Sequence, residues 1–161
     1  MVSRKPRVLI FIVAYNAERT IEKVLQRIPP ELSEYDTEIL VIDDSSRDRT
    51  FERALALERA SELSFPLTVL FNPTNLGYGG NQKVGFHYAI QNHYDVVALV
   101  HGDGQYAPER LPELLLPLVN GEADAVFGSR MIQRKDALRG GMPFYKYVGN
   151  RILSSFENKL L

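Results

Sequence analysis

Short apolar runs alternate with helix-period segments along this chain, and this alternation strongly limits what it can fold into. The first run, residues 8–14, is continuous and rich in β-branched side chains. Such a run is typical of a strand that is buried on both faces. A helical stripe follows from Ile21 to Ile28 and stops at two prolines. Further strands are predicted at 38–42, 67–71 and 96–100, and helices at about 50–63, 81–92 and 109–120. The alternation predicts an α/β fold with a mostly parallel sheet flanked by helices.

The overall composition excludes several classes of protein. A chain of 161 residues predicts a single domain, 1–161, and 45% hydrophobic residues are enough for a packed core. The sequence has no cysteine, which excludes disulfides and thiolate metal sites. A formal net charge of -1 argues against a general nucleic-acid binder. No apolar run in the sequence reaches the roughly 18 residues of a membrane span.

Polar residues follow the predicted strands directly. In parallel sheets, ligands bind beyond the carboxyl ends of the strands, so these residues are the candidates for chemistry. They are Ala14, Tyr15 and Asn16 after the first strand, Asp43 and Asp44 after the second, residues 72–80 after the third, and His101, Gly102 and Asp103 after the fourth.

Asp43 and Asp44 are the strongest local indication of a binding site in the sequence. Carboxylates at a strand end can accept hydrogen bonds from a base N–H or a ribose hydroxyl, whereas they would repel a phosphate. The structural alternative is that Asp48 or Ser46 caps the following helix. Capping explains one residue but leaves two adjacent like charges unexplained. We therefore predict that the pair recognises a nucleoside.

A glycine-rich stretch lies between the third strand and the next helix. Gly77, Gly80 and Lys83 belong to it, and it is expected to be a loop that leads into a helix N-terminus. Exposed N–H groups there attract phosphate, although glycine stretches are also ordinary turns. The stretch lacks the Gly-Lys-Ser/Thr ending of a P-loop. No dinucleotide fingerprint follows the first strand either.

The segment from His101 to Gln105 is the predicted metal and diphosphate site. Asp103 is a hard oxygen ligand, and one carboxylate plus substrate phosphates is a usual arrangement for Mg2+. Mn2+ is the other candidate cation. His101 is predicted as a second ligand, and its alternative is a strand-end histidine bonded to the backbone.

The last part of the chain is basic. From Arg130 to Arg151 there are six basic residues and one acid, a net charge of +5. This segment is either a solvated face or an anion site. A short strand is predicted at 124–127, and a last helix from about 143 carries an apolar stripe. The stripe either packs on its own core or faces a second copy of the chain, a missing part of a longer enzyme, or a membrane surface.

Together the motifs resemble family 2 inverting glycosyltransferases of the GT-A fold, with dolichyl- and polyprenyl-phosphate glycosyltransferases as the most similar subgroup. The resemblance runs in the family's order over about residues 7–151. The matching stretches are residues 13–16, 41–50, 75–80 with Gly85, 102–105 with Pro108 and Glu109, and 128–130.

The resemblance implies roles for individual residues. Tyr15, Asp43 and Asp44 would hold the nucleoside of a nucleoside-diphosphate sugar. Asp103 would bind the divalent metal on the donor diphosphate. The catalytic set would be completed by Gln105 beside the sugar and Arg130 at a donor or acceptor phosphate.

Two departures from the family pattern stand out. The usual D-x-D reads His101-Gly102-Asp103, so one carboxylate is absent. Ala17 stands where the family has a glutamate, and the alternative is that Glu18 substitutes for it. Family members also continue beyond the last residue of this chain. We therefore expect a catalytic domain that is truncated on its C-terminal side, or a minimal variant.

The implied reaction is transfer of a sugar, with inversion, to a polyprenyl phosphate or a glycan. The expected location is the cytoplasm, at the cytoplasmic face of a membrane if the acceptor is a lipid. One alternative is a nucleotide-sugar binding module without turnover. Another is a nucleotide-dependent oxidoreductase, which the lack of a glycine fingerprint after Val13 disfavours.

Overall fold

The computed structural model describes residues 4–128 and Gly149. The chain divides into two compact units, Met1–Val126 and Phe127–Leu161, and the fold described below is that of the first. Most of the second unit lies outside the described residues. This includes Arg130, the basic segment and the terminal apolar stripe, so the predictions made for them stay predictions. The single domain 1–161 stays a prediction as well.

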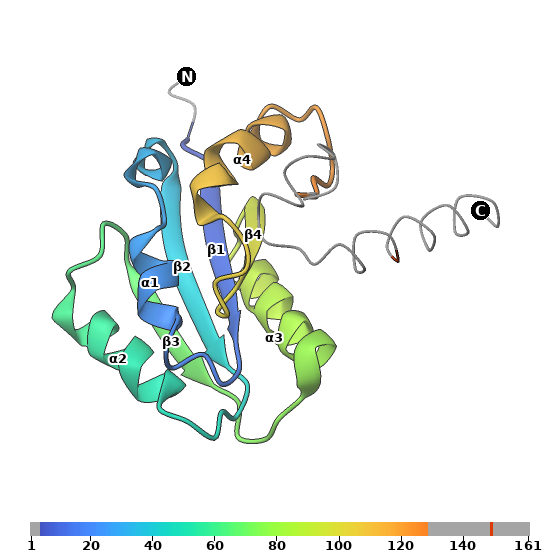
Figure 1. Ribbon diagram of the computed structural model, residues 1–161. Coiled ribbons are helices and arrows are strands. Elements are labelled where there is room, and N and C mark those ends of the chain that lie inside the picture. The colour runs from blue at the N-terminus through green and yellow to red at the C-terminus, as the bar shows by residue number, and fades with distance from the viewer. Residues whose placement is uncertain (1–3, 129–148, 150–161) are drawn as a thin grey trace. The chain divides into compact units, whose positions relative to one another are not determined.

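Four parallel strands form the sheet of the first unit (Figure 1). They are β1 (Arg7–Ala14), β2 (Asp36–Asp43), β3 (Leu67–Phe71) and β4 (Val96–His101), in the order β3-β2-β1-β4. In the register of the sheet, Ala14 lies opposite Asp43 and Val13 opposite His101. The strands predicted at 8–14, 38–42, 67–71 and 96–100 and the parallel α/β sheet are confirmed, and the carboxyl ends of β1, β2 and β4 share one edge.

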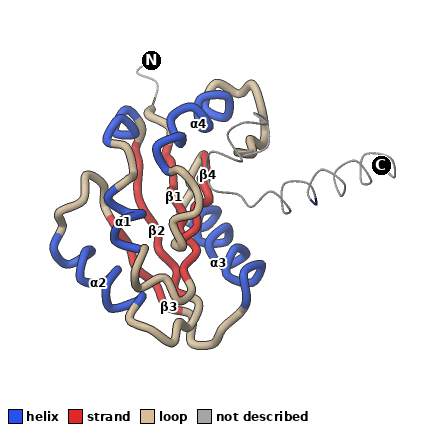
Figure 2. Tube along the Cα trace, in the orientation of Figure 1, coloured by secondary structure: helices blue, strands red, loops and turns tan. Residues whose placement is uncertain are grey.

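Helices cover both faces of this sheet (Figure 2). They are α1 (Ile21–Gln26), α2 (Thr50–Ala60), α3 (Gly77–Gln91) and α4 (Leu111–Val119), with 3-10 turns at Pro30–Glu34 and Pro108–Arg110. Alternate residues of a strand point to opposite faces. Ile10 accordingly packs in the core with α1, α2 and α4, whereas Phe11 packs in the core with α3.

One predicted helix boundary and one predicted strand are wrong. Helix α3 begins at Gly77 rather than near residue 81, so the glycine stretch is the start of a helix and not a loop. Glycine disfavours helix, but hydrogen bonds from neighbouring elements override this preference here. The strand predicted at 124–127 is also wrong, because these residues pair with none of β1–β4 and Phe127 is 87% exposed. Apolar character alone therefore does not establish a strand at 124–127.

Within the described ranges, no helix is both long enough and apolar enough to cross a membrane.

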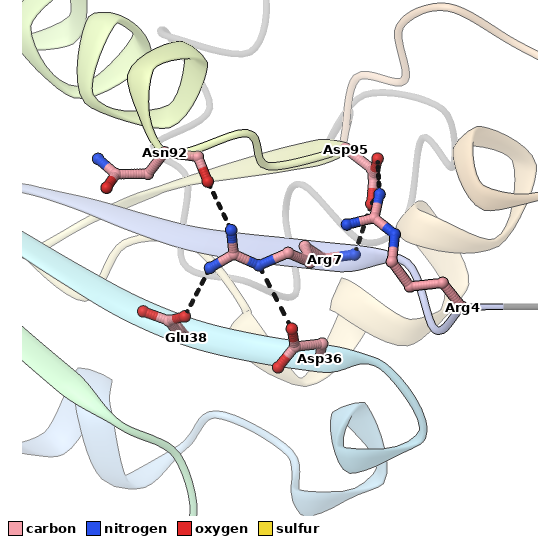
Figure 3. A network of polar contacts seen from close by, with 6 residues as sticks. All are labelled: Arg4, Arg7, Asp36, Glu38, Asn92 and Asp95. Atoms are coloured by element: carbon pink, nitrogen blue, oxygen red, sulfur yellow. Dashed lines mark hydrogen bonds and ion pairs between the residues drawn. The ribbon is translucent and has the colours of Figure 1, made fainter.

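Arg7 ties the amino ends of the strands together (Figure 3). Its guanidinium donates to the Asn92 carbonyl at 2.5 Å and to Glu38 Oε1 at 2.9 Å, and it lies 3.3 Å from Asp36 Oδ2. The same group lies over the ring of Tyr94, 4.5 Å from the ring centroid. Arg7 therefore joins β1 to β2 and to the turn between α3 and β4, at the edge opposite the polar residues.

We expect Arg7→Met to lower the free energy of unfolding by about 1–3 kcal/mol, because Glu38 loses a charged partner in a partly buried place. Arg4→Met is the matched control, since Arg4 is 65% exposed and pairs with Asp95, which is 40% exposed. An exposed pair of this kind contributes about 0–1 kcal/mol. Urea unfolding of the two variants measures both changes, and equal effects would contradict the assignment.

Candidate functional site

Hydrogen bonds join the loops that follow β1 and β2, and these loops form one side of the site. Asp43 is fully buried, and its carboxylate accepts hydrogen bonds from the Ser46 N–H at 3.0 Å and from the Ser46 hydroxyl. Ser46 Oγ accepts in turn from the Asn16 N–H at 2.8 Å. Burial raises the pKa of Asp43, while the bonds from Ser46 act in the opposite direction. The two loops therefore form one hydrogen-bonded unit.

Asn16 shapes the loop after β1. Its φ of 49° lies in the left-handed region, which asparagine tolerates better than most residues. Its Oδ1 accepts from the Arg47 N–H at 2.9 Å, which ties the two loops a second time. The chain buries Ala14 and leaves the ring of Tyr15 47% exposed. The predicted nucleoside-binding aromatic is thus accessible at the edge of the sheet.

Neither Asp48 nor Ser46 is the N-cap residue of α2, which is Arg49 and makes no side-chain capping bond, but Asp48 still bonds the start of this helix. Its Oδ1 accepts from the N–H of Thr50, the first residue of α2, at 3.1 Å. Its Oδ2 accepts from the Glu18 N–H at 3.1 Å. Asp48 therefore supports the helix start and the β1 loop, and it leaves Asp43 and Asp44 for other roles.

Asp44 is the hub of a buried polar network. Its Oδ1 accepts from Asn72 Nδ2 and from the Leu76 N–H, both at 2.9 Å. Its main-chain carbonyl accepts from Asn75 Nδ2 at 2.9 Å. Asn81 Nδ2 donates to the Ile42 carbonyl at 3.0 Å. The network fastens the start of α3 to the end of β2.

The sequence analysis placed Asn72 and Asn75 in the candidate segment after the third strand, but it assigned no role to any of the three asparagines of this network. The signal was present, because Asn72, Asn75 and Asn81 bracket the glycine stretch and asparagine readily bonds main-chain groups in turns. Their partners lie 28 to 39 residues away in the chain, so only the fold reveals them.

Helix α3 begins with the glycine stretch at this edge. Gly77 has a φ of 72°, which favours glycine, and its N–H donates to Asn75 Oδ1 at 3.0 Å. The first N–H groups of a helix lack partners within the helix. Gly80 lies in the first turn of α3, and the exposed Lys83 lies in the second. The predicted phosphate contacts therefore share one helix start.

The end of β4 presents Asp103. The Gly102 N–H donates to the Val13 carbonyl at 2.9 Å, and the Gly102 carbonyl accepts from the Thr20 hydroxyl at 2.7 Å. A Cβ at Gly102 would lie only 3.2 Å from the Val13 carbonyl oxygen, so the close approach favours glycine. Asp103 is exposed, and its Oδ1 accepts from the Gln105 N–H at 3.0 Å. This turn holds a carboxylate out toward solvent.

His101 lies between two tyrosines. Its Nε2 is 2.9 Å from the Tyr78 hydroxyl, and the centroids of these two rings are 5.0 Å apart. The Tyr106 ring lies on it with a centroid distance of 4.5 Å. Burial, with the nearby Tyr106, raises the pKa of Tyr78. The imidazole thus contacts one ring from α3 and one from the loop after β4.

The fold brings most of the predicted site residues to one edge of the sheet, and Arg130 lies outside the described residues. Among the residues that the structure describes, no group of three or more His, Cys, Asp or Glu side chains can enclose a metal ion. Asp103 Oδ2 accepts no hydrogen bond within this part of the chain. One open carboxylate fits a cation that takes its remaining ligands from water and from a bound phosphate.

Comparison with known proteins agrees with this arrangement. Residues 9–156 match the family described as glycosyl transferase family 2. An undecaprenyl-phosphate mannosyltransferase from Micrococcus luteus is 36% identical over 78% of this chain and 49% of its own length. A UDP-N-acetylglucosamine--dolichyl-phosphate N-acetylglucosaminyltransferase from Methanococcus voltae is 29% identical over 91% of this chain and 60% of its own length. The chain thus spans about half the length of these curated relatives.

A solved structure shows the same fold. The glucosyl-3-phosphoglycerate synthase of Mycobacterium tuberculosis, in complex with Mn2+, UDP-glucose and phosphoglyceric acid, is 25% identical. It superposes with a TM-score of 0.52 over 73% of this chain and 40% of the synthase. The predicted GT-A fold is confirmed. With a family match over residues 9–156, the chain belongs to glycosyl transferase family 2.

Proposed function

We propose that this chain binds the donor of a hexosyl transfer, in which a sugar moves from a nucleoside diphosphate to a polyprenyl phosphate with inversion. One observation carries the proposal. Three neighbouring strand ends bring an exposed aromatic ring at Tyr15, the buried pair Asp43 and Asp44, and the open carboxylate of Asp103 to one edge. Lipid-phosphate acceptors in the names of the two relatives support this choice of acceptor.

Asp44 is the better candidate of the pair for the nucleoside. Both oxygens of Asp43 accept from Ser46, whereas the hydrogen bonds to the Asp44 carboxylate all reach Oδ1. No buried side-chain polar atom of the described residues lacks a partner, so Asp44 Oδ2 keeps contact with solvent. That oxygen can accept a hydrogen bond from a base N–H or a ribose hydroxyl. Tyr15 supplies an exposed ring at the end of the neighbouring strand, where the Asp44 N–H donates to the Ala14 carbonyl at 2.9 Å.

Asp103 would hold the divalent cation, Mg2+ or Mn2+, together with the donor diphosphate. The Mn2+ in the solved synthase complex supports a divalent cation as the cofactor. When bound, such a cation neutralises the charge that develops on the leaving diphosphate. Gly77 and Gly80 lie in the first turn of α3, whose positive end favours the same phosphates, and Lys83 offers a positive charge.

The acceptor step needs no proton transfer if the acceptor is a lipid phosphate. An anionic phosphate oxygen attacks the anomeric carbon from the face opposite the diphosphate. A new C–O bond forms as the C–O bond to the donor breaks, and the nucleoside diphosphate leaves. A glycan hydroxyl would instead require a general base. Gln105 beside the sugar and Arg130 at a phosphate complete the proposed set, at the cytoplasmic face of a membrane.

A thermal-shift panel of nucleoside-diphosphate hexoses, each with Mg2+, Mn2+ or EDTA, tests donor binding. We expect one donor to raise the melting temperature more with metal than with EDTA. Radiolabelled sugar transfer to undecaprenyl or dolichyl phosphate then tests turnover. Binding without transfer would favour the alternative of a binding module, and no binding of any donor would overturn the proposal.

Asp44→Asn gives a sharper test of nucleoside recognition. The asparagine oxygen can still accept from Asn72 and Leu76, but its amide turns the acceptor at the Oδ2 position into a donor. We expect affinity for the nucleoside diphosphate to fall about tenfold, the size of one lost charged hydrogen bond. The loss should be equal with metal and with EDTA in calorimetric titrations. A loss seen only with metal would assign Asp44 to the cation instead.

A further inference from the structure

We propose that His101 is a positioning residue that holds Asp103 in place, and that it is not itself a metal ligand. It acts through a ring clasp, which we define as Tyr78, His101 and Tyr106. The inference rests on the proposed function, in which Asp103 holds the cation. It explains how a chain with His101 at the first position of the D-x-D motif can keep the carboxylate at the third.

The first half of the clasp occupies one of the two imidazole nitrogens, Nε2. Tyr78 belongs to the first turn of α3, and its hydroxyl lies 2.9 Å from His101 Nε2. A metal ligand must present a free nitrogen lone pair to the ion. At Nε2, a cation would compete with the tyrosine hydroxyl for the same position. The contact instead anchors the end of β4 to α3.

The second half of the clasp closes the turn that carries Asp103. Tyr106 lies three residues after Asp103, and its ring packs on His101 with a centroid distance of 4.5 Å. The chain therefore folds back on itself between His101 and Tyr106. Gly104, with a φ of 74°, allows this reversal. Asp103 lies within the closed turn, where its Oδ1 accepts from the Gln105 N–H.

The reversal also separates the roles of His101 and Asp103. In an extended strand, residues two apart point to the same side, and both could reach one ion. The strand ends at His101, and a turn follows it. Within the described part of the chain, these two residues have no third metal-ligating neighbour. The geometry favours an aromatic support for a single carboxylate ligand.

Two substitutions of His101 separate support from ligation. His101→Phe keeps an aromatic ring for Tyr106 but cannot bind metal, whereas His101→Ala removes both. We measure GDP and UDP affinity by calorimetry, with Mn2+ and with EDTA. For His101→Ala we expect the gain in affinity from Mn2+ to fall about 10–100-fold, as when a group supporting a ligand is lost. For His101→Phe we expect about a threefold fall, the size of one neutral hydrogen bond. Neither variant should change affinity in EDTA.

The hydrogen-exchange rate of the Gln105 amide is measured in metal-free protein. This rate would not depend on His101 if His101 acted only as a metal ligand. This N–H donates to Asp103 Oδ1, so its exchange rate reports directly on the turn. We expect faster exchange in His101→Ala and near wild-type exchange in His101→Phe. Tyr106→Ala should behave like His101→Ala, and it replaces His101→Ala in the test if that variant does not fold. His93→Ala, at an exposed histidine after α3, is the matched control and should change neither quantity.

The outcomes distinguish this inference from the proposed function. Equal loss of the Mn2+ effect in His101→Phe and His101→Ala, with unchanged exchange, would make His101 a ligand and overturn the clasp. Unchanged Gln105 exchange in both His101→Ala and Tyr106→Ala would also overturn it. A wild-type protein that binds no nucleoside diphosphate would overturn the proposed function, while the exchange measurement would still decide whether the clasp holds Asp103.

Discussion

Asp103→Asn is expected to remove the metal-dependent part of nucleoside diphosphate binding and to leave the fold intact. Asp103 is exposed, so the substitution disturbs no packing, and an asparagine oxygen can still accept from the Gln105 N–H. The neutral amide, however, binds a divalent cation far more weakly than a carboxylate does. Loss of a group that merely supports a ligand lowers metal affinity about 10–100-fold, so loss of the ligand should lower it by about 100-fold or more.

Calorimetric titration with Mn2+ and with EDTA measures the effect directly. Asp124→Asn makes the same chemical change at another exposed aspartate and should behave like the wild type. Asp44→Asn should lower affinity under both conditions, whereas Asp103→Asn should lower it only when metal is present. Metal-dependent affinity that is unchanged in Asp103→Asn would remove this residue from the metal site.

The sheet and the edge that carries the site could be predicted because both depend on local pattern and general topology. A continuous apolar run such as residues 8–14 leaves few alternatives to a strand buried on both faces. Once strands alternate with helices, the strand ends must meet at one edge. The positions of Asp43 and Asp103 at that edge therefore followed from the sequence alone.

The contacts that support these residues could not be predicted, because their partners are distant in the chain. Asn72 bonds Asp44, which is 28 residues away in the sequence, and Tyr78 contacts His101, which is 23 residues away. The hydrophobic periodicity of a sequence carries no information about such pairs. The prediction of a loop at the glycine stretch was wrong for a related reason. Glycine disfavours helix locally, but hydrogen bonds from the N–H groups of residues 76 and 77 to Asp44 and Asn75 fix the start of α3.

Helix α3 offers a second large effect, because two of its glycines differ in their surroundings. A Cβ at Gly85 would lie 2.1 Å from the ring of Phe11, which is completely buried in β1. Neither the ring nor the strand can retreat, so Gly85→Ala should push α3 away from the sheet. We expect a loss of about 3 kcal/mol in the free energy of unfolding, the upper end of the usual range for overpacking.

Gly79→Ala is the matched control in the same helix. A Cβ at Gly79 has nothing within 4 Å, and alanine restricts the unfolded chain more than glycine does. This variant should therefore gain stability, by about 0.5–1 kcal/mol. Urea unfolding of the two variants gives changes of opposite sign if α3 is pressed against Phe11. Because α3 also carries Tyr78, Gly85→Ala should speed exchange of the Gln105 amide, whereas Gly79→Ala should not. A stable Gly85→Ala protein would show that α3 lies farther from β1, and the support that Tyr78 gives to His101 would then need another origin.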